Sequence, residues 1–226
     1  MGGIKAVSFD MDGTLFQPTF ADEVWHEHLP RLYARRLGIP LEEAKRVVES
    51  EYERVGDERR EWYDLEFWIL KFGLGVTKEE IFSACGGKVK LYPEVRGVLE
   101  ALLKRFRLVI CTNAPKEFAQ FQLEKAGIRD MFFRVYSALT DFGELKKCST
   151  FQRILSELGL GPEELVHVGD HPKFDLEVPR SFGIRSYLMD RTGRFTGDYV
   201  IRDLRELEAK LDLLDPGWRG RTSGWQ

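Results

Sequence analysis

The sequence has few cysteines and no long apolar run, and each absence excludes a class of protein. Three cysteines in 226 residues are an odd number and too few for a disulfide framework, so a reducing compartment is expected. No apolar stretch approaches the ~20 residues of a membrane-spanning helix. Charge also interrupts the first ten residues too early for a secretory signal. We therefore expect a cytoplasmic protein without a membrane partner.

Charge of one sign and side-chain amides are also scarce. The chain carries 34 basic and 37 acidic residues, a net charge of −3, which gives no overall attraction to nucleic acid. Asparagine occurs once and glutamine five times beside 31% charged residues, a composition typical of thermophilic proteins. Hydrophobic residues make up 43% of the chain, enough for a buried core, so a disordered or fibrous protein is excluded.

Four short segments rich in valine and isoleucine are predicted to be buried strands. They are 4–9, 107–111, 165–168 and 185–189, with two weaker candidates at 132–137 and 198–201. Apolar residues at helical spacing lie between them, at 95–105, 118–126, 150–158 and 172–182. Alternating helices and mostly apolar strands predict an α/β fold, with a Rossmann-like parallel sheet covered by helices on both faces.

The stretch 17–90 breaks this alternation. It contains no convincing strand, and its apolar spacing predicts helices at 21–37, 41–54, 62–72 and 78–84. We expect an all-helical domain at 17–90, inserted into an α/β core made of 1–16 and 91–214. The last residues, 215–226, lack periodicity and are expected to form a flexible tail.

Polar residues follow the predicted strands at their carboxyl ends, where parallel sheets bind ligands. These residues are Asp10 and Asp12 after 4–9, Thr112 and Asn113 after 107–111, and Asp170 after 165–168, with Asp175 five residues on. Three carboxylates that converge without compensation repel one another, and a divalent hard cation such as Mg²⁺ removes that conflict. Asp175 lies further along the chain and is better placed to orient ligands than to bind the cation.

Three of these segments resemble motifs of the haloacid dehalogenase superfamily. Asp10-Met-Asp-Gly-Thr14 is similar to its first motif and Cys111-Thr-Asn113 to its second, while Gly169-Asp170 with the later Asp175 is similar to its fourth. The order and spacing of these motifs cover about 4–205. The resemblance implies the superfamily's fold with a helical cap of its first class, inserted after the first motif.

The third motif departs from the Lys-Pro form that is common in the superfamily. Here the segment 143–148 reads Gly-Glu-Leu-Lys-Lys-Cys, without proline. Its distance from Asp170 favours Lys146 as the phosphate-binding lysine, and Lys147 stays open as an alternative. The groups that the resemblance implies as phosphate ligands are Thr112, Asn113 and Lys146.

The resemblance implies a Mg²⁺-dependent phosphatase, which is a phosphoric monoester hydrolase acting on a small phosphorylated metabolite. Asp10 is the implied nucleophile, which forms a phosphoaspartyl intermediate. Asp12 is the implied general acid and base. Mg²⁺ is implied to bind Asp10, the main-chain carbonyl of Asp12 and Asp170.

Asp12 also separates the branches of the superfamily. Its dehalogenases attack carbon without a metal and lack an acid two residues after the nucleophile. The phosphonate-cleaving branch typically carries alanine at that position. A carboxylate at Asp12 therefore points to phosphate esters.

The cap is expected to close over the phosphate and to contact the rest of the substrate. The candidate substrate contacts in the cap and the core are Phe16, Arg59, Arg60, Trp62, Tyr63 and His171. Plainer interpretations compete with these roles, because Arg59 and Arg60 are also typical surface charges. Trp68 has helical spacing with its aromatic neighbours, which indicates the core of the cap.

Two further hypotheses stay open on the sequence. A phosphomutase would use the same aspartyl phosphate, and a non-catalytic aspartyl-phosphate switch or binding scaffold would use the same strand-end residues. A receiver-like switch is about half this length and has no cap, and a dead scaffold is expected to have lost Asp10, Asp12 or Asp170. The substrate is undetermined, and both a monomer and a homodimer are compatible with the sequence.

Overall fold

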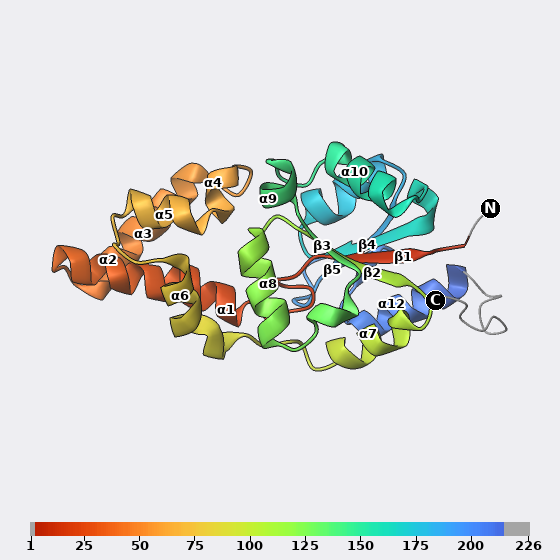
Figure 1. The fold of residues 1–226 in the computed structure, drawn as a ribbon, viewed down its shortest axis with the longest axis horizontal. Helices are drawn as coiled ribbons and strands as arrows, with labels where there is room; N and C mark the ends of the chain where they lie inside the picture. The colour runs from red at the N-terminus through yellow and green to blue at the C-terminus, as the bar shows by residue number, and fades with distance from the viewer. Residues whose placement is uncertain (1–2, 215–226) are drawn as a thin grey trace.

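The strands form one parallel sheet (Figure 1). The computed structural model describes residues 3–214, and the tail predicted at 215–226 lies outside the described residues. The strands are β1 (Ala6–Phe9), β2 (Arg107–Thr112), β3 (Arg134–Ser137), β4 (Leu165–Gly169), β5 (Arg185–Met189) and β6 (Val200–Ile201). Their order is β3-β2-β1-β4-β5-β6, and all neighbours pair in parallel. The predicted Rossmann-like α/β fold is confirmed, and both weaker strand candidates form strands.

Helices cover both faces of the sheet because successive strand residues are buried on opposite sides. One face packs against α7 (Val95–Leu103) and α12 (Leu204–Leu214), and the other against α10 (Cys148–Leu158). The remaining core helices are α8 (Lys116–Lys125), α9 (Ala138–Phe142) and α11 (Val178–Ser181). Two helices, α9 and α12, are not predicted by the sequence pattern. The first spans a single turn, which is too short for a periodic pattern, while the second repeats buried leucines at helical spacing.

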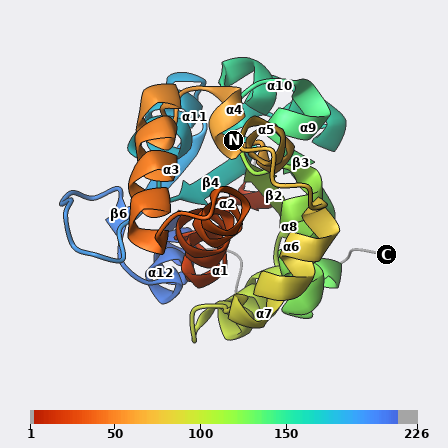
Figure 2. The ribbon, with the colours of Figure 1, turned by 90° about the vertical axis from the view of Figure 1, so that its left-hand side faces the viewer.

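The regular structure between residues 19 and 88 is all helical, and it lies beyond one end of the sheet (Figures 1 and 2). Its helices are α1 (Thr19–Asp22), α2 (Leu29–Leu37), α3 (Leu41–Val55), α4 (Arg60–Tyr63), α5 (Leu65–Lys71) and α6 (Lys78–Cys85). A π-helical turn, Glu23–His28, joins α1 to α2. The capping box of Thr77 and Glu80 starts α6, because each side chain binds the other's main-chain N–H.

The helical stretch has an aromatic core of its own. Trp68 is fully buried, stacks on Phe72 with ring centroids 5.4 Å apart and meets the ring of Tyr52 edge-on at 4.6 Å. Phe118 of α8 belongs to the same cluster and lies 4.9 Å from the ring of Phe20. Trp68 is therefore a core residue, and the cluster continues from the helical stretch onto the sheet domain.

The single helix predicted at 62–72 is wrong, since it is interrupted at Asp64. The Asp64 carboxylate accepts hydrogen bonds from the main-chain N–H groups of Glu66 and Phe67, at 3.0 and 3.2 Å, and thereby caps a new helix. As a result, Trp62 and Tyr63 lie on the separate short helix α4.

The chain leaves the sheet domain and returns to it at one place. The main-chain N–H of Gln17 donates to the carbonyl of Lys90 at 2.9 Å, and Phe16 pairs with Leu91 in an isolated β-bridge. The two connections therefore lie side by side. Within residues 3–214 no helix combines the length and the apolar character that crossing a membrane requires.

Candidate active site

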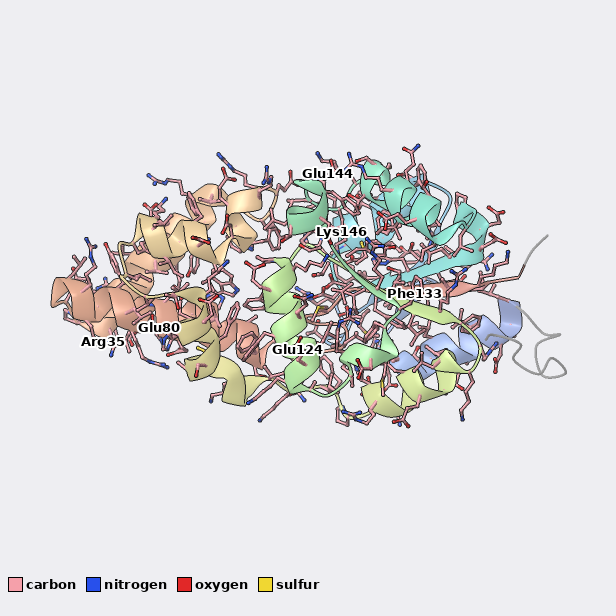
Figure 3. The ribbon with its side chains drawn as sticks, in the orientation of Figure 1. Arg35, Glu80, Glu124, Phe133, Glu144 and Lys146 are labelled. Carbon is pink, nitrogen blue, oxygen red and sulfur yellow. The ribbon has the colours of Figure 1, made fainter. Side chains whose placement is uncertain are left out.

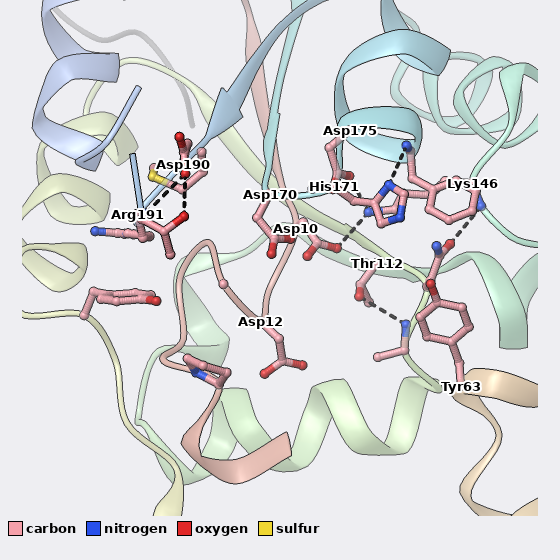
Figure 4. A pocket seen from close by; sticks show the side chains of 18 of the residues that line it. Asp10, Asp12, Tyr63, Thr112, Lys146, Asp170, His171, Asp175, Asp190 and Arg191 are labelled. Carbon is pink, nitrogen blue, oxygen red and sulfur yellow. Dashed lines mark hydrogen bonds and ion pairs between the residues drawn. The ribbon is translucent and has the colours of Figure 1, made fainter. Parts of the chain in front are cut away.

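The carboxyl ends of β1, β2 and β4 meet at a cavity of about 350 Å³, which we call the strand-end cavity. Asp10 follows β1, Thr112 ends β2 and Asp170 follows β4, and all three line the cavity (Figure 4). The order of the strands reverses at β1, so the crossover connections diverge there and leave a crevice. The sheet topology thus brings residues 160 positions apart in the sequence to one place.

Two glycines allow the loops around this cavity to approach each other. Gly13 has a φ of +74°, and a Cβ atom there would lie 2.2 Å from Oδ2 of Asp170. A Cβ atom on Gly169 would lie 2.2 Å from Cγ of Asp175. Any side chain at either position would force the acidic residues apart, so the site requires glycine at both.

Lys146 is the buried cation of the site. Its side chain is 2% exposed, and its Nζ donates to Oδ1 of Asp10 at 2.7 Å and to Oδ1 of Asp175. Burial alone would lower the pKa of the ammonium, but the carboxylates of Asp10 and Asp175 outweigh burial and raise the pKa above its usual value. Lys146 is therefore charged at neutral pH.

The two adjacent lysines differ in burial and in their partners. Lys147 is exposed, and its Nζ lies 3.6 Å from a carboxylate oxygen of Glu144. Lys146 instead points inward, among the strands, while Glu144 lies at the surface (Figure 3). The main-chain N–H of Lys146 donates to Oδ1 of Asn113 at 2.8 Å, which holds the lysine segment against the end of β2.

Asp175 connects Lys146 to the buried interior. Its Oδ1 also receives a hydrogen bond from Nε2 of His167 at 2.9 Å, and Nδ1 of His167 lies 3.0 Å from the hydroxyl of Ser8. Its Oδ2 accepts the main-chain N–H of His171 at 3.0 Å. Burial opposes ionisation of Asp175, but Lys146 and His167 lower its pKa well below the usual value. Asp175 is thus an ionised group with every oxygen bonded.

Asp12 lies across the cavity from Asp175 and Lys146, and its carboxyl group has fewer hydrogen-bond partners than that of Asp175. Its Oδ2 accepts a hydrogen bond from Nε2 of Gln122 on α8 at 3.3 Å, while its buried Oδ1 has no hydrogen-bond partner within residues 3–214. Burial, followed by the nearby Asp10 carboxylate, raises the pKa of Asp12 to about 7. A carboxyl group with this pKa can give and take a proton near neutral pH.

Asp170 and Asp10 form the part of the site that fits a metal ion. Ligand oxygens of Asp10, Asp170 and Asp175 lie within 4.8 Å of one another. Loss of solvation and the carboxylates of Asp10 and Asp175 raise the pKa of Asp170 well above its usual value. Burial raises the pKa of Asp10 as well, against the opposing effect of Lys146. One ammonium does not balance these carboxylates, and clustered carboxylate oxygens suit a hard divalent cation.

Thr112 and Asn113 hold different positions at the end of β2. The Oγ1 of Thr112 accepts the main-chain N–H of Ala114 at 3.1 Å, so its own hydroxyl hydrogen is the part available to an anion in the cavity. The side chain of Asn113 accepts a hydrogen bond from the main-chain N–H of Lys146, and Tyr63 of α4 lines the same cavity as Asn113. Asn113 therefore holds the lysine segment at the end of β2.

The candidate substrate contacts fall into two groups. Trp62, Tyr63 and His171 line cavities. Phe16 is fully buried in the main core and lines neither cavity, so the expectation that it contacts the substrate is corrected. The side chains of residues 59 and 60 are exposed and lie outside both cavities.

A second cavity, of about 240 Å³, adjoins the first. We call it the aromatic cavity, and it shares Asp12, Tyr63 and Ala114 with the strand-end cavity. Its remaining lining residues come from the helical stretch and from the start of α8: Ala21, Asp22, Trp25, His26, Tyr52, Trp62, Pro115 and Phe118. The two cavities therefore form adjoining spaces that meet at Asp12.

Some residues of the site were missed by the sequence analysis. Gln122 is a fully buried amide on α8, and His167 is a fully buried imidazole within β4. Each is a polar residue at a position that the helix or strand pattern buries, and that signal was present in the sequence. Arg191 follows β5, donates to the carbonyl of Thr14 at 2.7 Å and lies 3.7 Å above the ring of Tyr92. The position of the Arg191 side chain depends on the tertiary fold, and no local sequence pattern predicts it.

Comparison with known proteins points to one family. The family model of haloacid dehalogenase-like hydrolases matches residues 4–183. The chain is similar to a GMP/IMP nucleotidase of Escherichia coli, with 26% identity over 80% of this chain and 81% of the relative. It is also similar to a phosphoglycolate phosphatase of Chromobacterium violaceum, with 29% identity over 80% and 82% of the two chains.

Solved structures agree with this comparison. A phosphatase of the same superfamily from Thermococcus onnurineus superposes with a TM-score of 0.83 and 31% identity, covering 92% of this chain and 98% of the other. A 2-haloacid dehalogenase from Pseudomonas syringae superposes with a TM-score of 0.64 at 24% identity, covering 93% of this chain and 99% of the other. At that identity the second likeness shows the shared fold alone.

Proposed function

Because this chain belongs to the haloacid dehalogenase-like hydrolases and is a phosphoric monoester hydrolase, we propose that it cleaves a small phosphorylated metabolite through a phosphoaspartyl intermediate on Asp10, with Mg²⁺ as its cofactor. The relatives named above act on esters with very different leaving groups, so the comparison leaves the metabolite undetermined. The steps below follow from the residues around the strand-end cavity.

The observation that carries the proposal is the second carboxyl group, Asp12, two residues after Asp10. It lies at the junction of the two cavities, and burial raises its pKa to about 7. A proton donor on this side of the nucleophile suits the departure of an alkoxide from phosphorus. Attack on a carbon–halogen bond releases halide, which needs no proton, so the donor favours phosphate esters.

The first step forms a bond between a carboxylate oxygen of Asp10 and phosphorus and breaks the bond to the leaving oxygen. Oδ1 of Asp10 accepts from Lys146, which leaves Oδ2 as the attacking atom. The leaving oxygen takes the proton of Asp12 as its bond breaks. In the second step, Asp12 removes a proton from water as the water attacks phosphorus, and inorganic phosphate and free Asp10 result.

Charge in these steps is balanced by fixed groups. Lys146 and the hydroxyl of Thr112 are the donors that face the phosphoryl oxygens at the ends of the strands. Mg²⁺, when bound by the carboxylates of Asp10 and Asp170 and the main-chain carbonyl of Asp12, supplies positive charge that offsets the repulsion between phosphate and nucleophile. Asp175 holds Lys146 and the loop after β4 in place.

We propose that residues 17–90 act as a cap domain on a core formed by 1–16 and 91–214. The two connections at Gln17 and Lys90 lie side by side, which is the geometry of a hinge. Tyr63 of α4 and Asn113 of the core both line the strand-end cavity, which supports closure of α4 over it. Closure of this kind excludes water from the reacting phosphate.

The test is hydrolysis of p-nitrophenyl phosphate by the wild type and by Asp10→Asn. We expect turnover that requires Mg²⁺ and stops with EDTA, and a loss of about 10⁴-fold or more in Asp10→Asn. Asp130→Asn, an exposed acid remote from the cavity, is the matched control and should keep full activity. Unchanged activity in Asp10→Asn would refute the phosphoaspartyl mechanism.

The phosphomutase and switch hypotheses can be tested in the same system. A mutase would transfer phosphate within a sugar phosphate more often than to water. A switch would retain the phosphate on Asp10, which a beryllofluoride complex would mimic.

A cytoplasmic location, and a monomeric or homodimeric state, belong to the proposal. The three free cysteines support the reducing compartment.

A further inference from the structure

The aromatic cavity lies where the organic part of a substrate must extend. If phosphate occupies the strand-end cavity, its leaving oxygen must come within reach of Asp12, because Asp12 is the proton donor. Asp12 is one of three residues shared by the two cavities. The atoms attached to the leaving oxygen then continue past Asp12 into the aromatic cavity.

The charges around the aromatic cavity differ from those around the strand-end cavity. Among residues 3–214, neither lysine nor arginine lines the aromatic cavity, and the carboxyl groups in its lining are those of Asp12 and Asp22. The cations Lys146, Arg191 and Arg194 all line the strand-end cavity instead. A leaving group with its own carboxylate or phosphate would enter the aromatic cavity without a partner and near two acids, which is costly.

Aromatic rings form much of the wall of the aromatic cavity, and hydrogen bonds hold the main chain of two of these residues. The hydroxyl of Tyr52 donates to the carbonyl of Trp25 at 3.0 Å, and the indole N–H of Trp68 donates to the carbonyl of Trp62 at 3.3 Å. The ring of Trp25 stacks near Phe118, with centroids 6.4 Å apart and planes inclined by 23°. Flat ring walls favour a flat guest, since stacking and edge contacts both depend on ring geometry.

The size of the aromatic cavity sets a further limit. Its volume of about 240 Å³ is below the range of about 300–1,000 Å³ that is typical for drug-sized ligands. One ring system fits such a space better than a long chain. The π-helical turn that carries Trp25 and His26 supplies two of the lining residues, and π-helical turns occur frequently at functional sites.

We propose that the preferred substrates are phosphate monoesters whose leaving group carries an uncharged aromatic ring, and that Trp25 and Trp62 are the residues that bind this ring. The inference rests on the proposed phosphatase function. Aryl phosphates and nucleoside 5′-monophosphates share this chemistry. Phosphorylated hydroxy acids, whose leaving groups carry a carboxylate, are poor substrates on this proposal.

The experiment measures kcat/KM for four esters: phenyl phosphate, a nucleoside 5′-monophosphate, phosphoglycolate and methyl phosphate. Each ester is tested with the wild type, Trp62→Ala, Trp62→Phe and Trp25→Ala. Methyl phosphate has no ring, so its rate reports whether a variant still folds and carries out the chemistry. Phe133→Ala is the matched control, because Phe133 is an exposed aromatic residue that lines neither cavity. Arg194→Ala is added as a probe of the strand-end cavity, which Arg194 lines.

We expect the wild type to prefer one or both ring-bearing esters over phosphoglycolate. Trp62→Ala and Trp25→Ala should lower kcat/KM for the preferred ester by about tenfold to a hundredfold and leave methyl phosphate unchanged, because stacking on the substrate ring is lost. Trp62→Phe should restore most of the loss. The two ring-bearing esters distinguish between a simple aryl and a nucleoside leaving group.

Two results would overturn the inference. A preference for phosphoglycolate that Arg194→Ala removes would show that the leaving group is anionic and binds in the strand-end cavity, while the phosphatase function would stand. Equal losses for methyl phosphate and phenyl phosphate in the tryptophan variants would show a structural role only. If none of the four esters is hydrolysed, the proposed function is wrong and the inference falls with it.

Discussion

The two sides of the strand-end cavity hold the same kind of residue in opposite states. On one side, Asp175 is buried and ionised, and Lys146, His167 and the main chain of His171 satisfy both of its oxygens. On the other side, Asp12 carries a buried oxygen without a partner within residues 3–214. The pKa of the first carboxyl group is lowered, and burial raises the pKa of the second to about 7.

This difference shows how one site can be both rigid and reactive. The Asp175 side is complete in the free protein, so it fixes the geometry of Lys146 and of the loop after β4. The Asp12 and Asp170 side keeps unbalanced carboxylates, which a cation, a phosphate and a proton can complete. Substitutions on the first side should therefore reduce stability together with activity, whereas substitutions on the second side should reduce activity alone.

The largest effect should follow from Asp12→Asn. Removing the proton donor and acceptor should lower kcat for an alkyl phosphate by about 10²–10⁴-fold. The melting temperature should stay equal or rise, because the amide can still accept from Gln122 and carries no charge. Steady-state kinetics and thermal melts measure the two effects. A fall in stability of several kcal/mol would contradict the assignment of Asp12 to the reactive side.

Lys146→Met should damage both stability and activity. It leaves Asp175 and Asp10 without their cation in a buried site, which costs about 3–5 kcal/mol for a broken buried pair. Chemical denaturation measures the free energy of unfolding. Lys147→Met, at the exposed neighbouring position, should change it by less than about 0.5 kcal/mol. Equal effects in the two variants would show that the buried network is not formed in solution.

The metal-free protein should become more stable as the pH falls from 8 to 5. The folded pKa of Asp12 is raised from 3.8 to about 7, so its stabilising contribution is complete below about 4 and is lost as the pH rises through 7. The expected gain at pH 5 is about 3 kcal/mol. Chemical denaturation in EDTA at pH 8 and pH 5 measures the free energy of unfolding at each pH. In Asp12→Asn, the free energy of unfolding should change less between the two pH values than in the wild type.

The smallest effect should come from Gln122→Met. The variant removes the hydrogen bond to Asp12 that opposes the rise of its pKa, so the alkaline limb of the kcat profile should move to higher pH. We expect a loss of about threefold to tenfold in kcat with little change in KM. Gln152→Met, on the exposed face of α10, serves as the control. An unchanged pH profile would mean that Gln122 has a packing role and does not affect the pKa of Asp12.

The fold was accessible from the sequence because its signals are local. Apolar strands and helical spacing identified every strand of the sheet and most of its helices. The interruption at Asp64 was missed, since the aromatic spacing of 62–72 continues through it and only the side-chain cap breaks the helix. The five residues of α9 carry too little pattern for any periodic argument.

The site was accessible only in part. Asp10 and Asp170 are marked by their position after strands, and the sheet brings them together. Gln122 and His167 are recognisable as buried polar residues, but their partners are 110 and 8 positions away, and no spacing predicts them. Phe16 was misjudged because it is close in sequence to Asp12 while its side chain points into the core. Proximity along a chain does not determine which way a side chain points.

The most direct test of the contrast between the two sides is the effect of Mg²⁺ on thermal stability. Wild-type protein freed of metal with EDTA and then titrated with Mg²⁺ should gain about 2.7 kcal/mol when Mg²⁺ reaches 100 times its dissociation constant, seen as a rise in melting temperature. Asp170→Asn should show no such rise, because it removes a proposed Mg²⁺ ligand from the incomplete side. A wild type that Mg²⁺ leaves unchanged, or an equal rise in Asp170→Asn, would contradict the account.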